Sequence, residues 1–261
     1  MKTSRTIAEL REELSGSRIG LVPTMGALHD GHVALFRAAR AACDVVVASV
    51  FVNPTQFGDP ADLAAYPRDL TYDARIAADS GVDIMFAPTN DEMYPPGYAT
   101  WVEVEGPARG LEGDLRPGHF RGVATVCLKL FAMVHPHVAF FGQKDAQQVA
   151  VVKQVIRDLN LEIEIRVLPT VRDADGLALS SRNARLSPVD RTRALAIPRA
   201  LEAGLGAHRA GRDPVAAARA ALDDLEPDYV VVANFDGCPT LAIAARVGPA
   251  RLIDNVPLDA L

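Results

Sequence analysis

Short apolar runs alternate with amphipathic segments through the first two thirds of the chain. The run from Asp44 to Val52 is apolar almost throughout, which is typical of a strand covered on both faces in a parallel sheet. Residues at helical spacing follow most such runs, so the pattern predicts the order strand, helix, strand. We expect strands at 19–23, 45–50, 82–86, 138–141 and 161–168, and helices at 33–42, 70–78, 122–134 and 147–159. This order predicts an α/β protein whose N-terminal domain is a doubly wound, Rossmann-like parallel sheet.

The pattern changes after Pro169. A turn rich in Asp and Gly and a polar Ser-Ser-Arg-Asn stretch come first, and alanine-rich helical segments follow. We expect helices at 188–207 and 214–225, and strands at 229–233 and 251–256. The helical spacing and the flanking strands favour a smaller packed α+β domain over a disordered linker. The sequence therefore predicts two domains, residues 1–169 and residues 170–261.

Length, cysteine content and charge narrow the class of protein. A chain of 261 residues can bury roughly 70–75% of its unfolded surface, so it needs neither disulfides nor a metal to fold. The three cysteines lie far apart in apolar surroundings, which favours reduced thiols and a cytoplasmic protein. A net charge of −6 with scattered basic residues argues against a nucleic-acid partner. We expect no membrane association, because there is no apolar signal core and no run near the roughly 18–20 residues of a membrane span.

The junction between strand 19–23 and the next helix is the best clue to function. The strand ends at Pro23, and the chain passes through a glycine turn into His29-Asp30-Gly31-His32. A strand that turns through glycine into a helix start is expected to expose backbone N–H groups to an anion. The two imidazoles are three residues apart, so both reach the space above the first helical turn. Such a site suits a polyphosphate.

His29 and His32 allow three interpretations. A histidine near a helix start often only caps the helix. His-x-x-His is also a fragment of some zinc sites, although His-Glu-x-x-His is absent and the sequence indicates no third ligand. In the third interpretation, both rings donate hydrogen bonds to phosphate oxygens. The preceding strand and glycine turn favour this third interpretation.

Further polar clusters follow other predicted elements. Gly142–Asp145 comes directly after strand 138–141, and doubly wound sheets bind ligands at such carboxyl ends, although an ordinary helix start with Asp145 as its cap explains the segment equally well. Ser180–Asn183 lies on a predicted loop and is by itself more typical of a solvated loop. Asn53 and Gln56 offer carboxamides suited to hydroxyls and a carboxylate, although Asn-Pro also simply makes a turn.

Several catalytic motifs are absent from the sequence. There is no Gly-x-x-x-x-Gly-Lys-Ser/Thr loop, no complete dinucleotide fingerprint and no Gly-x-Ser-x-Gly elbow. These absences weaken kinase-type, hydride-transfer and serine-hydrolase functions.

Taken together, the segments 23–32, 51–57, 141–145 and 179–183 resemble the pantothenate synthetase family, in which these motifs occur in the same order. Residues 252–255 also look like that family's terminal strand. The family uses ATP to convert pantoate to pantoyl adenylate and pyrophosphate, and the amine of β-alanine then displaces AMP. The resemblance implies ATP as a substrate, Mg²⁺ that accompanies ATP, small-molecule partners only, and a homodimer through the N-terminal domain.

The resemblance also implies roles for individual residues. His32, as proton donor, acts in catalysis with His29, Lys144 and Arg182. Gln56 and Gln148 bind pantoate or β-alanine, with Asn53, Tyr66 and Arg116 as further contacts, and no protein ligand is assigned to Mg²⁺. Leu179 replaces the family's common methionine and Asp30 a frequent glutamate, and both changes should be mild. The implied ATP contacts are Pro23, Thr24, Met25, Gly26, Ala27, Leu28, His29, His32, Gly142, Gln143, Lys144, Asp145, Val171, Leu179, Ser180, Ser181 and Arg182.

Two other functions stay open from the residues alone. A nucleotidyltransferase that moves AMP onto a phosphate acceptor and stops there would share the site of His29 and His32. Formation of AMP only when both pantoate and β-alanine are present separates the ligase from it. A regulatory module that kept the fold would not need Lys144 and Arg182 together with both histidines. The position of Ser180–Arg182 near the predicted domain junction leads to the hypothesis that the C-terminal domain closes over ATP as a lid.

Overall fold

The computed structural model describes residues 1–16 and 18–259. The chain divides into two compact units. Unit 1 consists of Met1–Gly142 and Gln147–Leu168, and unit 2 consists of Gln143–Ala146 and Pro169–Leu261. The segment Gln143–Ala146 therefore belongs with the C-terminal residues, although unit 1 precedes and follows it in sequence. The prediction that residues 1–169 and 170–261 are separate domains stays a prediction.

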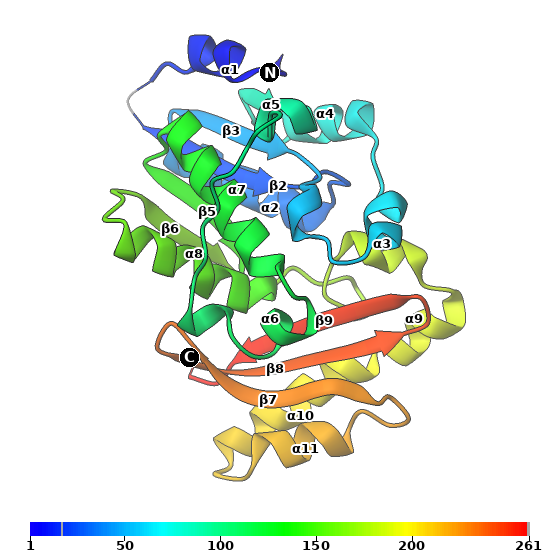
Figure 1. Ribbon diagram of the computed structural model, residues 1–261. Coiled ribbons are helices and arrows are strands. Elements are labelled where there is room, and N and C mark those ends of the chain that lie inside the picture. Colours follow the sequence, from blue (N-terminus) through cyan, green and yellow to red (C-terminus); the bar gives the residue numbers. More distant parts are fainter. Residues whose placement is uncertain (17, 260–261) are drawn as a thin grey trace. The chain divides into compact units, whose positions relative to one another are not determined.

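Unit 1 is built on a six-stranded parallel sheet with the order β1-β4-β3-β2-β5-β6 (Figure 1). From β2 the chain proceeds to β3 and β4 on one side, whereas β5 and β6 lie on the other side. The topological switch point therefore lies between β2 and β5, where doubly wound folds bind their ligands. This sheet confirms the predicted fold class. Its strands are β1 (Lys2–Ser4), β2 (Ile19–Thr24), β3 (Val45–Val50), β4 (Ile84–Phe86), β5 (Val138–Gly142) and β6 (Glu164–Leu168).

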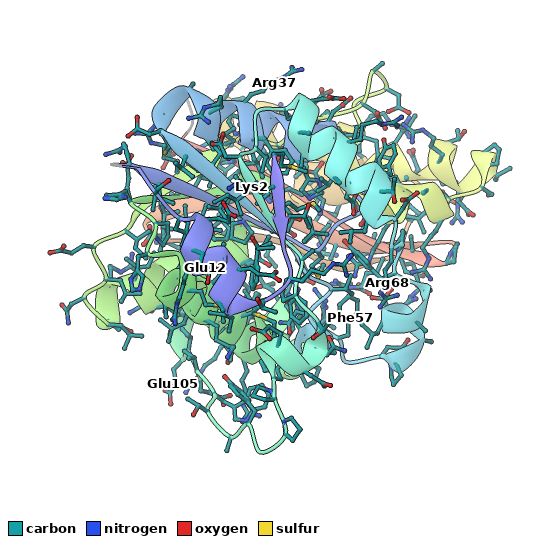
Figure 2. The ribbon with its side chains drawn as sticks, turned by 90° about the horizontal axis from the view of Figure 1, so that it is seen from above. Lys2, Glu12, Arg37, Phe57, Arg68 and Glu105 are labelled. Carbon is teal, nitrogen blue, oxygen red and sulfur yellow. The ribbon has the colours of Figure 1, made fainter. Side chains whose placement is uncertain are left out.

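Helices cover both faces of this sheet. Because successive side chains of a strand point to opposite faces, Val47 packs under α1, α7 and α8, while Val46 packs under α2 and α4. Figure 2, which turns the view of Figure 1 by 90°, labels Lys2 on β1 and Glu12 on α1. The longer helices are α1 (Ile7–Glu13), α2 (Asp30–Ala42), α4 (Leu70–Asp79), α7 (His119–Val134) and α8 (Ala146–Asp158). Short helices follow at α3 (Pro60–Ala65), α5 (Asn90–Met93), α6 (Glu112–Leu115), η1 (Pro54–Gln56) and η2 (Gly106–Ala108).

Unit 2 is a small α+β structure, as the sequence predicts. Its antiparallel sheet has the order β7-β8-β9, and α10 and α11 pack on one face of it (Figure 1). Ile197 and Leu201 on α10 meet Leu241 and Ile243 on the central strand in one apolar core. The elements are η3 (Gln143–Asp145), η4 (Ser181–Arg185), α9 (Pro188–Ala194), α10 (Ala196–Arg209), α11 (Pro214–Ala220), β7 (Pro227–Phe235), β8 (Cys238–Val247) and β9 (Ala250–Pro257).

Unit 2 differs from the sequence prediction in three elements. The helix expected at 188–207 is interrupted at Leu195, because Pro198 has no N–H to donate to Ala194 in a continuous helix. The helix expected at 214–225 ends earlier, at Ala220. The central strand β8 is not predicted at all, because its alanine-rich sequence has low intrinsic strand propensity, and its pairing with β7 and β9 stabilises it. No helix in the described ranges combines the length and apolar character of a membrane span.

Candidate active site

His29 and His32 lie together at the start of α2, as the sequence predicts. The Nδ1 atom of His29 accepts a hydrogen bond from the N–H of Gly31 at 3.2 Å. The Nδ1 atom of His32 accepts one from the N–H of His29, also at 3.2 Å. His29 and His32 also form a capping box, to which the bond between the His29 N–H and the His32 ring belongs, and the ring centroids are 4.1 Å apart. Both rings are therefore held against the first turn of the helix.

The capping bonds determine which nitrogen of each ring carries the proton. An Nδ1 atom that accepts a hydrogen bond has no proton, so each neutral ring is assigned its proton on Nε2. Helix capping and donation to phosphate are therefore compatible, because each function uses a different nitrogen. Within residues 1–16 and 18–259, no group of three or more His, Cys, Asp or Glu side chains could hold a metal ion, so the zinc interpretation gains no further ligand.

The glycine turn before α2 does not expose the backbone donors that the sequence predicts. The N–H of Gly26 donates to Thr24 Oγ1 at 3.2 Å. The N–H groups of Ala27 and Leu28 donate to the two carboxylate oxygens of Asp73 at 3.0 and 2.8 Å. The prediction was wrong for these groups because a buried carboxylate from α4 binds them. The remaining attraction for an anion comes from the imidazoles and the dipole of α2.

Asn53 and Gln56 form one hydrogen-bonded cluster at η1. The Nδ2 atom of Asn53 donates to Gln56 Oε1 at 3.0 Å and to the carbonyl of Gly122 at 3.2 Å. Its Oδ1 atom accepts from the hydroxyls of Thr55 and Tyr94, both at 2.9 Å. The Asn53 carboxamide is thus engaged within the protein and orients the carboxamide of Gln56. A direct contact of Asn53 with pantoate stays a prediction.

The cluster at η1 also reaches the glycine turn. Gln56 Nε2 donates to the sulfur of Met25 at 3.2 Å, so a residue implied in ATP binding touches one implied in pantoate binding. Gly122 allows α7 to approach closely, because a Cβ atom there would lie 2.6 Å from the carbonyl oxygen of Thr55. Unit 1 therefore brings the predicted nucleotide and acid motifs into contact.

Arg116 lies beside the backbone of Gln56, as part of a chain of hydrogen bonds. Arg116 donates from Nη1 to His119 Nε2 at 3.0 Å, and the Nδ1 atom of His119 is 3.0 Å from the Gln56 carbonyl to which it donates. The buried His119 was not predicted from the sequence, because its partner is far away in the chain. This chain of bonds places the guanidinium of Arg116 next to the predicted acid-binding segment.

Tyr66 ends helix α3 and is buried in unit 1. Its ring meets the ring of Phe57 edge to face, with the centroids 5.8 Å apart. Arg68 donates to the carbonyl oxygen of Tyr66 at 3.0 Å. Figure 2 labels Phe57 and Arg68, whose segments flank α3. Tyr66 thus packs against the residue that follows Gln56, and its contact with substrate stays a prediction.

The adjacent glutamines of α8 have different surroundings. Gln147 is buried, accepts from the N–H of Glu112 at 3.1 Å, and donates to the carbonyls of Pro107 and Gly110 at 3.1 Å. Gln148 is half-buried, and its side chain forms no hydrogen bond with the described residues. Gln147 therefore ties a loop to the helix, while the Gln148 carboxamide keeps its capacity for a ligand.

In unit 2, Asn255 on β9 holds the segment that contains Lys144. Asn255 Nδ2 donates to the carbonyls of Gln143 and Lys144 at 3.0 and 2.8 Å. Asn255 Oδ1 accepts from Gln143 Nε2 at 3.1 Å. The ammonium of Lys144 lies 3.6 Å from the carboxylate of Asp145. The backbone shape around Lys144 thus depends on a strand more than one hundred residues later.

Val171 and Leu179 face each other across a tight hairpin in unit 2. The N–H of Leu179 donates to the carbonyl of Val171 at 3.0 Å, and Gly176 turns the chain with φ 90°. Arg172 in this hairpin binds both carboxylate oxygens of Asp254, at 2.6 and 3.1 Å. Burial raises the pKa of Asp254, although Arg172 opposes this effect.

Ser180–Arg182 follow the hairpin directly. Ser180 caps η4 by accepting from the N–H of Arg182 at 3.3 Å, so Ser181 and Arg182 begin this helix. Within unit 2, adjacent residues Asp254 and Asn255 thus hold the hairpin and the Lys144 segment. Their roles were not predicted, although two polar residues in a largely apolar strand were a usable signal. Asp73 gave a weaker signal, because it shares a helix face with Leu70, Ile76 and Ala77 but lies on a helix with several other polar residues.

The parallel sheet, the turn after β2 and the paired imidazoles define the class of the protein as an α/β protein with a Rossmann-like sheet and a candidate anion site after a central strand. Comparison with known proteins then gives the family. The family model of pantoate-beta-alanine ligase matches residues 2–257, and the chain belongs to this family.

Relatives match over almost their full length. The chain is 51% identical to the pantothenate synthetase of Moorella thermoacetica, over 99% of both chains. It is 50% identical to that of Roseiflexus sp., over 100% of both chains. The crystal structure of pantothenate synthetase from Thermus thermophilus matches with a TM-score of 0.95 and 45% identity, over 99% of both chains. A pantoate-beta-alanine ligase from Francisella tularensis, complexed with beta-gamma ATP and beta-alanine, matches with a TM-score of 0.86 and 36% identity, over 100% of this chain and 99% of that one.

Proposed function

We propose that this chain catalyses the ATP-dependent condensation of pantoate with β-alanine to form pantothenate. The observation that carries this proposal is the match of residues 2–257 to the pantoate-beta-alanine ligase family. The ligands of the Francisella tularensis protein support ATP and β-alanine as substrates. The contact between Met25 and Gln56 supports a site where a nucleotide and an acid can meet.

The reaction proceeds in two steps. A carboxylate oxygen of pantoate attacks the α-phosphorus of ATP, and the bond from this phosphorus to the leaving pyrophosphate breaks. The amine of β-alanine then attacks the acyl carbon of pantoyl adenylate, the bond to AMP breaks, and the amine nitrogen loses a proton. The residues around the first step must therefore stabilise negative charge that develops on phosphate oxygens.

In unit 1, we assign this charge stabilisation to the paired imidazoles. His29 and His32 donate through Nε2, the nitrogen that the capping bonds leave protonated in each neutral ring. His32 supplies the proton for the leaving pyrophosphate. Gln56, oriented by Asn53, and Gln148 bind the hydroxyls and carboxylate of pantoate, with Tyr66 and Arg116 as further contacts.

In unit 2, Lys144 and Arg182 supply positive charge for the triphosphate. The other ATP contacts in this unit come from the hairpin residues Val171 and Leu179 and from the start of η4, with the apolar side chain of Leu179 against adenine. Each segment has a defined backbone in this unit, because Asp254 and Asn255 hold it from β9. A fixed backbone holds the side-chain donors of these segments in position, so that they lose little entropy when they bind the triphosphate.

Three further properties are part of the proposal. Mg²⁺ enters as the counter-ion of ATP rather than at a site of its own, the chain forms a homodimer through its N-terminal region, and it works in the cytoplasm. The family resemblance supports the dimer. Light scattering during size-exclusion chromatography measures its mass directly, and a monomer at assay concentration contradicts it.

An AMP-release assay that omits each substrate in turn tests the reaction. We expect AMP only when ATP, pantoate and β-alanine are all present, and no AMP when EDTA removes Mg²⁺. An enzyme that moves AMP onto a phosphate acceptor keeps AMP in its product, so it releases no AMP and does not require β-alanine. No AMP with all three substrates present, or AMP release that does not depend on β-alanine, contradicts the proposal.

A further inference from the structure

A buried carboxylate on α4 holds the turn that precedes the two histidines. Asp73 is 1% exposed and lies in the first turn of α4. Its Oδ2 atom accepts from the N–H of Ala27 at 3.0 Å, and its Oδ1 atom accepts from the N–H of Leu28 at 2.8 Å. One carboxylate therefore binds two consecutive backbone donors that lie more than forty residues away in sequence.

The turn has a shape that requires such support. Gly26 and Ala27 both have left-handed backbones, with φ of 77° and 52°. Ala27 carries a Cβ atom, which makes this conformation unfavourable. A Cβ atom on Gly26 would lie 2.7 Å from Asp73 Oδ2, so the turn and the carboxylate fit closely against each other. The two bonds to Asp73 favour this otherwise costly conformation.

Retaining a carboxylate here opposes folding. Burial raises the pKa of Asp73, although the N–H groups of Leu28 and Ala27 partly counter this effect. A carboxyl with a higher pKa in the folded than in the unfolded chain makes folding less favourable once the pH exceeds its ordinary value. In the described part of the chain, no lysine or arginine forms an ion pair with Asp73. A neutral residue would be expected here if packing alone mattered.

We propose that Asp73 is a positioning residue for ATP activation, which holds Ala27 and Leu28 and thereby orients His29 and His32. His29 directly follows Leu28, and its N–H is bound to the ring of His32. A shift of the turn therefore moves both imidazoles. Asp73 also removes two N–H groups that would otherwise bind phosphate oxygens, which leaves phosphate binding to the rings. The inference rests on the proposed function and adds a residue to it.

Asp73→Asn tests this role with the smallest change in shape. The variant keeps one oxygen for one N–H and places an NH₂ group against the other, so the turn loses one anchor. We expect kcat/KM for ATP in pyrophosphate release to fall by about a hundredfold, as for catalytic groups displaced by about 1 Å. Pantoate affinity, measured by calorimetry without ATP, should stay unchanged.

Asp69→Asn is the matched control. Asp69 caps the same helix by accepting from the N–H of Tyr72 at 2.9 Å, and Asn is also a good cap. This variant removes one negative charge from the same helix end without touching the turn. Its kinetic constants should equal those of the unmodified chain.

The imidazole signals give a readout that a merely structural role would not change. Nitrogen NMR of the unmodified chain should show His29 and His32 with protons on Nε2. Asp73→Asn should shift these two signals and leave that of His208, in unit 2, in place. Gly26→Ala disturbs the same contact from the side of the turn, because its Cβ atom would strain the left-handed backbone and displace the carboxylate, and it remains informative if Asp73→Asn does not fold.

Distinct results overturn the positioning role and the proposed function. Folded Asp73→Asn and Gly26→Ala variants with normal kcat/KM for ATP and unshifted histidine signals overturn the role of Asp73. If the unmodified chain forms no pantothenate, the proposed function fails instead, and the NMR comparison still measures the effect of Asp73 on the histidines.

Discussion

The turn before α2 in unit 1 and the Lys144 segment in unit 2 are both held by a buried polar side chain from a distant element. In unit 1 the anchor is the carboxylate of Asp73, which accepts from two backbone N–H groups. In unit 2 the anchor is the carboxamide of Asn255, which donates to two backbone carbonyls. The anchors therefore bind backbone groups of opposite polarity.

This difference has a chemical meaning for binding an anion. Asn255 donates to the carbonyls of Gln143 and Lys144 and so offsets the partial negative charge of these oxygens near the Lys144 side chain. Asp73 binds the N–H groups of Ala27 and Leu28, which could otherwise bind phosphate oxygens. The imidazoles remain as the donors for phosphate. Unit 1 thus gives up general anion binding for groups that can transfer a proton, whereas unit 2 binds the two carbonyls beside Lys144 with a neutral side chain.

The largest effect on stability is expected when Asp254, which holds the hairpin of unit 2, loses its ion pair with Arg172. Arg172→Met leaves the buried Asp254 without its guanidinium, and breaking such a pair costs about 3–5 kcal/mol of unfolding free energy. The loss should shrink as the pH falls from about 8 to about 5, because Arg172 lowers the pKa of Asp254 and its removal lets the carboxyl bind a proton more readily. Urea unfolding at both pH values measures this.

Arg191→Met is the control for that variant. Arg191 on α9 pairs with Asp173 and Asp175, which lie in the hairpin. All three side chains are about one-third exposed. Exposed pairs contribute little, so its loss of stability should be much smaller. Equal losses for the two variants would show that Asp254 does not hold the hairpin through Arg172.

The next effect concerns the imidazoles that Asp73 orients. His32→Ala should slow pyrophosphate release by about a hundredfold, or about 3 kcal/mol, because an aimed donor is lost. The variant also loses the bond from the His29 N–H to the His32 ring, which is half of the capping box, so its folding is checked by circular dichroism. His208→Ala, which replaces a half-buried histidine of unit 2, is the control. A folded His32→Ala variant with a normal rate would contradict the assigned role.

A smaller effect is expected from the neutral anchor. Asn255→Asp keeps the side-chain shape but sets carboxylate oxygens against the carbonyls of Gln143 and Lys144, at a cost of about 2 kcal/mol. We expect KM for ATP to rise about tenfold or more, with unchanged NMR signals for His29 and His32. Asn234→Asp, an exposed swap in the same sheet, is the control. An unchanged KM for ATP would separate the Lys144 segment from nucleotide binding.

Much of the fold was predictable because its elements are local patterns. The strand predicted at 45–50 agrees with β3 to the residue, because a continuous apolar run is typical of a buried strand. β8 was missed because alanine favours strands only where neighbours supply the pairing. The interruption of the helix at Leu195 was also missed. The sequence did contain a signal for it, because Pro198 cannot continue the hydrogen-bonding pattern of a helix.

The candidate site was predictable only as motifs. The histidines, Gln56 and Lys144 follow strand ends, so their type and position were informative. Asp73 and Asn255 could not be assigned roles from the sequence, because each acts on a backbone far away in the chain. The expected row of exposed N–H groups was wrong for the same reason: a glycine turn indicates that donors exist, but not which acceptor reaches them first.

The four residues Gln143–Ala146 have a consequence for dividing the chain. They belong to unit 2, yet unit 1 precedes and follows them, so the polypeptide passes between the units three times. A proteolytic cut or a gene truncation at Leu168 therefore does not release a complete C-terminal half. The fragment from Pro169 onward would carry Asn255 without the carbonyls that it binds, and Lys144 would remain on the other piece. Split-protein reassembly, rather than expression of one piece, is the appropriate way to dissect this chain.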